Sequence, residues 1–377
     1  MRIAFTGDFY VPHSMNTLPS FGTGLRKLMA YCMGVMVKFE GPLDEGSGSK
    51  TAFTTGPNLR QNAKTLDHLV QAGVTAVGLA NNHSADFGES ALRWTADVAD
   101  AAGIQIAGLW QGDKCRFAEW REDGLVVRVL AFAEEEWSGD QKAGTHVAIF
   151  DLAGAANQIA ATKNQADAVL VCLHGNNEHS SPPNPSFARN TRFLIDSGAD
   201  GVIVHHSHQI SGLEINRDRP IFFGLSNFLF ATRAKNAHWH EGLLATATIV
   251  RNSEGLSVIP QNYPLEVDPK TFTVEFCDPE KAANIENDVA ALSQTIIAPD
   301  SLAAHSEDFV AQSEKMYDVF LNPFAQSNRL SRILGRLWVR HVFLKKKRQA
   351  ILINALRCDA HRSAMTQHLL NRLAKGG

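Results

Sequence analysis

Residues 79–88 read LANNHSADFG, and this stretch places two asparagines and a histidine directly after a short apolar run. The residues just before it, 74–78, read VTAVG and, with Leu79, have the composition of a buried strand. In open α/β sheets, binding and catalytic groups lie just outside the carboxyl ends of the strands. We therefore predict that residues 74–82 form a strand of an α/β fold and that its last residues line a functional site.

Similar apolar runs recur through the first 250 residues or so and alternate with helical patterns, which is typical of an α/β domain. Several of these runs also end on a polar residue that can bind a metal or carry a proton. The predicted buried strands are RIAFTGD (2–8), VMVKFE (35–40), VTAVGLANN (74–82), IQIAGL (104–109), LVVRVLAFA (125–133), DAVLVCLHG (167–175) and DGVIVHH (200–206).

A second group of strands is joined by short turns, which predicts antiparallel pairing and a mixed sheet system. Strand signals fade after Asp268, and a helix with its own capping acids is predicted from Asp278. We therefore divide the chain into a domain at 1–268 and a helical, basic extension at 269–377. The antiparallel group consists of GLEI (212–215), PIFFGLS (220–226), GLLATATIVR (242–251) and LSVIPQNYPLEV (256–267).

The composition restricts the class of protein. Of the 377 residues, 44% are hydrophobic and 20% are charged, as in a globular protein with one large core or two smaller ones. The five scattered cysteines form no metal-binding or disulfide pattern, which favours a reducing compartment. Without a secretory pattern or a run of about 18 apolar residues, we expect a cytoplasmic protein that does not span a membrane.

The charge is unevenly distributed along the chain. From Gln326 onward there are 12 Lys and Arg residues against one acid, Asp359, although the net charge of the whole chain is −3. One interpretation is a helix that packs on the core and exposes a basic face. The alternative is attachment to an anionic polymer or, at the inner face of the membrane, to anionic lipid, where each basic residue contributes about 1 kcal/mol. Nucleic acid is a weaker candidate because aromatic residues are not interleaved.

Five polar clusters follow predicted strands, and together they indicate metal chemistry. Each alone has an ordinary explanation, such as a turn residue, a cap or a hydrogen-bonded histidine. Their common position at strand ends favours convergence on one site. Carboxylate, amide and imidazole ligands suit one or two divalent ions of the Mn, Fe, Co or Zn kind, which activate water for hydrolysis. The clusters are Asp8, Glu40, Asn82 with His83, His174 with Glu178, and His206 with His208.

The order of these motifs resembles the CapA family, also called the poly-γ-glutamate biosynthesis proteins, which are similar to the calcineurin-like metallophosphoesterases. The resemblance covers roughly residues 1–250 and implies a four-layer αββα sandwich of metallophosphoesterase type, with a helical C-terminal extension outside it. The motifs that carry it are GD, EGP, LANNHxxDxG, LHGxNE with PxPS, GADxxIxHHxHQIxGLE and PIFFGLSNFLF.

The resemblance also implies a role for each residue. Tyr10 stands where the metallophosphoesterase pattern has a histidine ligand, and Gly175 and Ser207 replace a common tryptophan and proline, which leaves the number of metals and the substrate fit open. His83 is expected to protonate the leaving group or to stabilise the transition state. The residues expected to hold one or two metal ions are Asp8, Glu40, Asn82, His174, His206 and His208.

The remaining marked residues are expected to support the ligands or to contact the substrate. Glu178 is predicted to orient His174, because ligating imidazoles usually donate their other N–H to a carboxylate or carbonyl. Asn227 is expected to tie the site loops together, and Asp86 to cap the next helix. Others in this group are Tyr10, Asn81 as a turn residue, and Arg189, which faces either solvent or an anionic substrate.

These observations favour a metal-dependent hydrolase of phosphoesterase type that acts in biosynthesis or remodelling of a capsular or other anionic extracellular polymer, either polysaccharide or poly-γ-glutamate. Its substrate would be an anionic polymer or a phosphoester. Two alternatives stay open. One is a metal-dependent amide hydrolase that acts on polyglutamate, and the other is a non-catalytic factor that uses the basic segment to recruit a membrane-bound polymer synthase.

Overall fold

The computed structural model describes residues 1–15, 18–43, 46, 57–136, 138, 144–232, 237–253, 255–313 and 356. One compact unit spans Met1–Ser306, and a second, Glu307–Gly377, is described only at 307–313 and 356. The basic segment that begins at Gln326 therefore lies outside the described residues, apart from Leu356. The boundary predicted at residue 268 falls inside the first unit.

The first unit contains a nine-stranded sheet in the order β2-β18-β17-β16-β1-β3-β4-β5, with β15 paired to β1. Strands β1, β3, β4 and β5 run parallel to one another, whereas β16 and β17 form a long antiparallel hairpin. The bounds are β1 (Arg2–Tyr10), β2 (Ser20–Phe21), β3 (Gly34–Phe39), β4 (Ala76–Gly78), β5 (Gln105–Ala107), β15 (Asn227–Phe230), β16 (Glu241–Asn252), β17 (Gly255–Val267) and β18 (Thr273–Phe276).

A second sheet has six strands in the order β13-β14-β12-β11-β9-β8. Its four central strands are parallel, and each edge strand is antiparallel to its neighbour. The bounds are β8 (Ala118–Glu122), β9 (Leu125–Ala133), β11 (Ala168–His174), β12 (Gly201–His205), β13 (Leu213–Asn216) and β14 (Arg219–Phe222). A small third sheet joins β6 (Leu109–Gln111), β7 (Lys114–Cys115) and β10 (Thr145–Val147).

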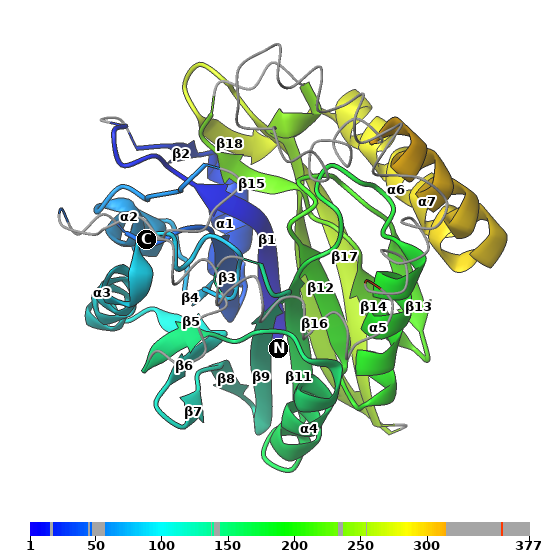
Figure 1. Cartoon of the computed structure of the whole chain (residues 1–377), viewed down its shortest axis with the longest axis horizontal. Helices are drawn as coiled ribbons and strands as arrows, with labels where there is room; N and C mark the ends of the chain where they lie inside the picture. The colour runs from blue at the N-terminus through cyan, green and yellow to red at the C-terminus, as the bar shows by residue number, and fades with distance from the viewer. Residues whose placement is uncertain are drawn as a thin grey trace. The chain divides into compact units, whose positions relative to one another are not determined.

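Helices cover the outer faces of the two large sheets, so the layers follow the order helix, sheet, sheet, helix (Figure 1). Helices α1 (Thr23–Tyr31), α2 (Thr65–Gln71) and α3 (Gly88–Ala101) lie on the side of the nine-stranded sheet. Helices α4 (Leu152–Lys163) and α5 (Pro185–Asp196) contact β11 and β12 of the other sheet. The predicted α/β sandwich with mixed sheets is confirmed.

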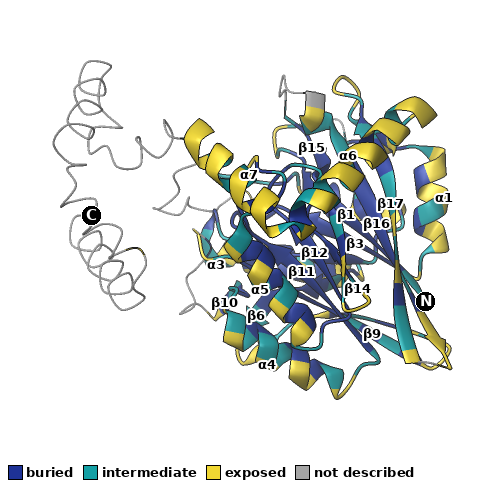
Figure 2. Cartoon of the chain, turned by 90° about the vertical axis from the view of Figure 1, so that its right-hand side faces the viewer, coloured by how far each residue is buried: buried dark blue, intermediate teal, exposed yellow. Residues whose placement is uncertain are grey.

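Side-chain alternation along β11 decides what faces the space between the sheets. Leu170 and Cys172 belong to the core between the two sheets, whereas Val169 and Val171 belong to the core beneath α4 and α5. Both sets are fully or almost fully buried, as the dark interior of Figure 2 shows. Because successive side chains alternate between faces, His174 lies on the inter-sheet side, at the carboxyl end of the strand.

The chain after Asp268 holds both a helix that was predicted and a strand that was not. Asp278 caps α6 (Pro279–Ile297) by accepting a hydrogen bond from the Lys281 amide at 2.9 Å, and the helix contacts β13 and β17. The expectation that strands end near Asp268 is wrong, because β18 pairs with β17 in the larger sheet. Four residues are too few to show an alternating pattern.

Helix α7 (Pro299–Gln312) follows α6 along the chain. No helix in the described ranges is long and apolar enough to cross a membrane.

Gly7 lies where β1 meets the segment before β15, and this contact generates a stability prediction. A Cβ atom on Gly7 would lie 2.1 Å from the backbone oxygen of Ser226, so Gly7→Ala must displace the backbone. We expect a loss of about 1–3 kcal/mol in the free energy of unfolding, measured by urea denaturation. The control Gly144→Ala, whose Cβ meets only a flexible Glu89 oxygen at 3.4 Å, should change it by less than about 0.5 kcal/mol. Equal effects of the two substitutions would contradict the prediction.

Candidate metal centre

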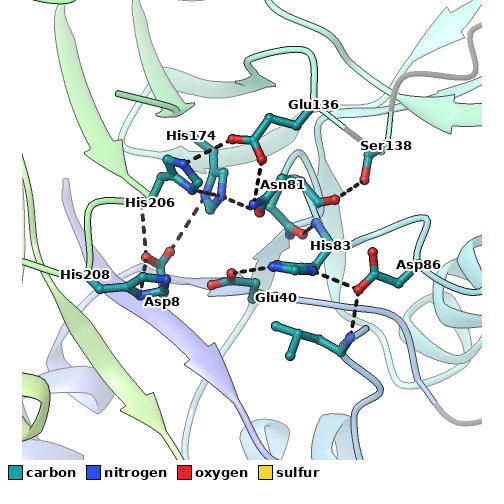
Figure 3. Close-up of polar contacts among 12 residues, drawn as sticks. Asp8, Glu40, Asn81, His83, Asp86, Glu136, Ser138, His174, His206 and His208 are labelled. Atoms are coloured by element: carbon teal, nitrogen blue, oxygen red, sulfur yellow. Dashed lines mark hydrogen bonds and ion pairs between the residues drawn. The ribbon is translucent and has the colours of Figure 1, made fainter. Parts of the chain in front are cut away.

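Polar side chains from the carboxyl ends of both sheets meet at one edge of the sandwich (Figure 3). β1 supplies Asp8 near its end, and the loops after β3 and β4 supply Glu40, Asn82 and His83. From the other sheet come His174, at the end of β11, and the loop after β12. The convergence results from parallel strands whose carboxyl ends share an edge. All six predicted metal ligands are buried there, namely Asp8, Glu40, Asn82, His174, His206 and His208.

The first group of candidate ligands consists of Asp8, Glu40 and His208, each of which offers one atom within 4.8 Å of the other two. The hydrogen bonds of Asn227 fix the form of the His208 ring. Its Nδ2 donates to the backbone oxygen of Trp239 at 3.1 Å, so its Oδ1 accepts from His208 Nδ1 at 2.9 Å. The proton is therefore on Nδ1 of His208, which also lies 3.6 Å from Asp8 Oδ2, and the lone pair of the neutral ring is on Nε2.

The second group consists of Asn82, His174 and His206. His174 Nε2 lies 3.0 Å from Asn82 Oδ1 and 3.1 Å from His206 Nδ1, so it is close to one atom of each of the other two residues. Because an amide oxygen only accepts, His174 Nε2 carries the proton in this contact and Nδ1 has the lone pair. Asp8 connects the two groups, because its Oδ2 accepts the backbone N–H of His206 at 3.1 Å and its Oδ1 lies 3.8 Å from His174 Nδ1. The ligands are thus arranged as two adjoining half-sites.

The backbone of the HHSH segment is held in an unusual conformation. His206 has φ 98° and His208 has φ 52°, a region that residues with a Cβ rarely adopt. Each such residue costs about 1–3 kcal/mol and persists only where its surroundings enforce it. Here the Asp8 carboxylate accepts a hydrogen bond from the His206 amide. His205, the residue before it, is held by a hydrogen bond between its Nε2 and the backbone oxygen of Thr6 at 3.0 Å. The conformation places the two imidazoles 6.5 Å apart between ring centroids, His206 beside His174 and His208 beside Asp8.

Three buried atoms of the candidate ligands have no partner within the described protein, and they test whether a cation fits. They are Asp8 Oδ1, Glu40 Oε2 and His174 Nδ1. Buried polar atoms are almost always hydrogen-bonded, because an unpaired one costs about 1–3 kcal/mol. Carboxylate, amide and imidazole donors are also the set that a divalent transition ion accepts. The residues present therefore fit such an ion.

Burial raises the pKa of both site carboxyls. The pKa of Asp8 rises to about 6, partly offset by the charge of Lys38. The pKa of Glu40 is raised well above its usual value, first by burial and then by the charge of Asp8. Burial lowers the pKa of Lys38 to about 8, although both carboxylates favour its charged form, and its ammonium donates to the backbone oxygen of Ala80. A single buried ammonium thus faces two acids.

The imidazoles divide into neutral ones and one that favours its charged form. Burial, with the charge of Lys38, keeps the pKa of His174 well below its usual range. Burial and the neighbouring His206 lower the pKa of His208 to about 3. Burial disfavours charge on His206 as well, but the hydrogen bond and charge of Glu136 outweigh it and raise the pKa of His206. Neutral imidazoles have the lone pair that metal binding needs.

His83 is paired with a carboxylate that was predicted to do something else. Its Nδ1 lies 2.8 Å from Asp86 Oδ2, which also accepts the Leu59 amide at 2.7 Å, and its Nε2 lies 3.9 Å from Glu40 Oε1. The prediction that Asp86 caps α3 is wrong, because the N-cap position is Phe87 and has no side-chain hydrogen bond. Asp86 instead fixes the His83 ring with Nδ1 protonated and Nε2 facing the site.

The other predicted residues divide into those at the site and those away from it. Asn81 ties β3 to the turn after β4, with Nδ2 on the backbone oxygen of Phe39 at 2.7 Å, and the Tyr10 ring packs on Phe230 with centroids 5.0 Å apart. Glu178 is exposed and its charge raises the pKa of Asp8, Glu40 and His206, but no hydrogen bond among the described residues joins it to His174. Arg189 lies on the exposed face of α5, and the described contacts include none between it and the ligands.

The loop after β9 carries site residues that the sequence analysis missed. Glu136 accepts from Asn82 Nδ2 at 3.2 Å and lies 3.1 Å from His206 Nε2. Glu134 accepts the Asn176 amide at 2.8 Å, beside Gly175, where a Cβ would lie 2.6 Å from a Glu134 oxygen. The signal was present in AFAEEE (131–136), an acidic run directly after a predicted strand, in the same position as the other clusters.

Two facing sheets with carboxylates, an amide and imidazoles at their shared edge are what the resemblance to the CapA-like, metallophosphoesterase-related proteins implied. Residues 2–232 match the family described as bacterial capsule synthesis protein PGA_cap. This match covers more than half of the sequence, and the chain belongs to that family. The predicted family is confirmed.

The chain is also similar to individual proteins. It is 26% identical over 196 residues to capsule biosynthesis protein CapA of Bacillus anthracis, which covers 48% of this chain and 47% of the relative. It is 29% identical over 161 residues to a probable polyglutamine synthesis accessory protein of Mycobacterium tuberculosis (strain CDC 1551 / Oshkosh), covering 39% and 42%. The chain thus spans about half the length of the curated relatives it matches. The solved structure of calcineurin-like phosphoesterase YfkN from Bacillus subtilis is 14% identical, with a TM-score of 0.45, 81% of this chain and 98% of that chain being covered.

The raised pKa of Asp8 generates a prediction for the metal-free protein. The folded-state pKa of about 6 exceeds the ordinary value of 3.8, so stability from this group is full below about pH 4 and is lost as the pH rises through about 6. Asp8→Asn has no carboxyl group to ionise at this position, so the variant keeps this stability as the pH rises. With a chelator present at about pH 8, we expect the variant to have a free energy of unfolding higher than that of the wild type by on the order of 1–3 kcal/mol. The difference in the free energy of unfolding between the variant and the wild type, measured by urea denaturation, should become smaller as the pH falls toward about 4.

Added Mn²⁺ provides the matched control for this prediction. It should stabilise the wild type more than Asp8→Asn, because binding to the folded state alone shifts the unfolding equilibrium and the variant lacks a ligand of the first half-site. A variant less stable than the wild type at about pH 8 without metal would show that the Asp8 carboxylate is adequately solvated or paired by protein groups.

Proposed function

We propose that this protein is a metal-dependent hydrolase of phosphoesterase type that acts in biosynthesis or remodelling of a capsular or other anionic extracellular polymer. The observation that carries the proposal is the set of unpaired buried atoms Asp8 Oδ1, Glu40 Oε2 and His174 Nδ1 among further candidate ligands. Membership in the capsule synthesis family supports the biological setting. A bound cation supplies an activated water and polarises the bond to be broken.

We assign different roles to the candidate ligands and to His83 from their geometry. Asp8, Glu40 and His208 would hold one ion, and Asn82, His174 and His206 a second. His83 carries its Asp86-bound Nδ1 proton away from the site, so its Nε2 is the atom that exchanges a proton with the leaving group.

The proposed chemistry applies to more than one kind of bond. A water activated by a divalent ion attacks phosphodiesters, phosphomonoesters or the γ-amide of polyglutamate. We favour phosphoesters because an Asn–His pair with several imidazoles resembles the metallophosphoesterase pattern. Hydrolysis of a polyglutamate amide is the alternative within the same chemistry.

A second candidate function is that of a non-catalytic factor in polymer assembly. The matched Mycobacterium tuberculosis relative is described as an accessory protein. Tyr10 also stands where a histidine ligand would complete the first half-site, and its ring packs on Phe230 instead. In this alternative the fold is kept and the basic segment after Gln326 recruits a membrane-bound synthase.

The hydrolase proposal is tested by His83→Gln, which removes the proton donor without touching the candidate ligands. We expect the variant to keep its bound metal and to lose about 10²- to 10⁴-fold in kcat. The measurements are metal analysis of purified protein and turnover of chromogenic phosphate monoesters and diesters, with polyglutamate fragments run in parallel.

Controls separate the possible outcomes of that experiment. His13→Gln changes an exposed histidine and should leave both metal content and kcat unchanged. Asp8→Ala should bind less metal than the wild type, because it lacks a ligand of the first half-site. A wild type with no bound transition metal would refute the hydrolase, and turnover of polyglutamate fragments alone would favour the amide alternative. Wild-type turnover no higher than that of His83→Gln would favour the accessory role.

The basic segment has its own prediction. Deletion of residues 327–377 is expected to abolish sedimentation with anionic vesicles at low salt, because about 1 kcal/mol per basic residue is lost, and to leave turnover intact. Replacing Lys345, Lys346, Lys347 and Arg348 by glutamine should weaken binding in proportion, and zwitterionic vesicles serve as the control. Full-length protein that ignores anionic vesicles at low salt would assign the segment a structural role.

A further inference from the structure

One carboxylate in the site touches two candidate ligands at once. Glu136 Oε1 lies 3.1 Å from His206 Nε2, and Glu136 Oε2 accepts from Asn82 Nδ2 at 3.2 Å (Figure 3). The Glu136 side chain is 28% exposed, whereas His206 is almost fully buried. Glu136 therefore covers the second half-site from the solvent side and bonds to two of its three members.

These contacts decide which atoms of the two ligands are left for a cation. A carboxylate accepts hydrogen bonds, so the amide group of Asn82 must turn its Nδ2 toward Glu136 and its Oδ1 toward His174. For the same reason His206 carries a proton on Nε2, which leaves Nδ1 pointing at His174 Nε2. Without such a contact a neutral imidazole would carry its proton on either ring nitrogen, and a side-chain amide could present either its oxygen or its nitrogen.

The loop that carries Glu136 is itself fixed to the same segments. Ser138 donates to the backbone oxygen of Asn82 at 2.7 Å and accepts the Ala85 amide at 3.3 Å. The amide of Glu134 donates to the backbone oxygen of His174 at 2.9 Å. The carboxylate of Glu136 is thus delivered by a loop held at both sides of the site.

We propose that Glu136 is a positioning residue that presents Asn82 Oδ1 and His206 Nδ1 to a divalent cation in the second half-site. This proposal rests on the proposed function, because it requires that the half-site binds a metal. Glu136 does not itself contribute a ligand atom. It orients the ligands in the way that carboxylates commonly orient metal-bound histidines.

The test is the affinity of the whole purified chain for Mn²⁺ after removal of metals, measured by calorimetric titration. Glu136→Gln is expected to bind Mn²⁺ about 10- to 100-fold more weakly, because the glutamine side chain offers only one accepting oxygen and no charge. Glu135→Gln is the matched control, since Glu135 is an exposed carboxylate one residue earlier; it should bind within about twofold of the wild type.

A second readout separates positioning from general destabilisation and needs no metal. The ring nitrogens of His206 in isotope-labelled, metal-free protein, at a pH high enough to make the ring neutral, should show Nε2 protonated and Nδ1 unprotonated in the wild type and a mixture of the two neutral forms in Glu136→Gln. Affinity equal to the wild type in Glu136→Gln, or an unchanged ring signature, would overturn the positioning role. A wild type that binds no Mn²⁺ would instead refute the metal centre itself, and the intact ring signature would distinguish that failure.

Discussion

The burial of two carboxyl groups at the edge between the sheets is the constraint on which the rest of the structure depends. Asp8 and Glu40 are almost completely removed from water, with one buried ammonium, Lys38, close enough to influence both. Such an arrangement is costly unless the charges are compensated. The remaining features of the site, namely neutral imidazoles, unpaired oxygen atoms and strained ligand backbone, all suit a positive ion as that compensation.

The two half-sites are not equivalent, and the difference comes from Tyr10. In the first, the phenol ring packs away on Phe230, so only Asp8, Glu40 and His208 remain as donors. In the second, three donors are already near one another and their orientation is set by neighbouring groups.

Much of the architecture was predictable because it follows from local patterns. The apolar runs that lead to Asp8, Glu40, Asn82 and His174 contain strands, although the strand predicted at 74–82 is confined to Ala76–Gly78 and Asn82 lies in the turn after it. Parallel strands that share an edge bring their ends together. What failed depended on tertiary contacts. Asp86 looked like a helix cap but faces His83, and the orienting carboxylate comes from the loop after β9 rather than from Glu178. Which of several nearby acids faces a given ring is decided by loop paths, which spacing alone does not encode.

The alternation along β11 has a consequence for how the chain finds its native alignment. A slip of β11 by a single residue, about 3.3 Å, would turn His174 toward the outer helices and push Leu173 between the sheets. Such a mispaired chain would lose an imidazole and gain a hydrophobic side chain at the same spot. Ion binding as proposed would therefore stabilise only the correctly paired sandwich and so favour the native register during folding.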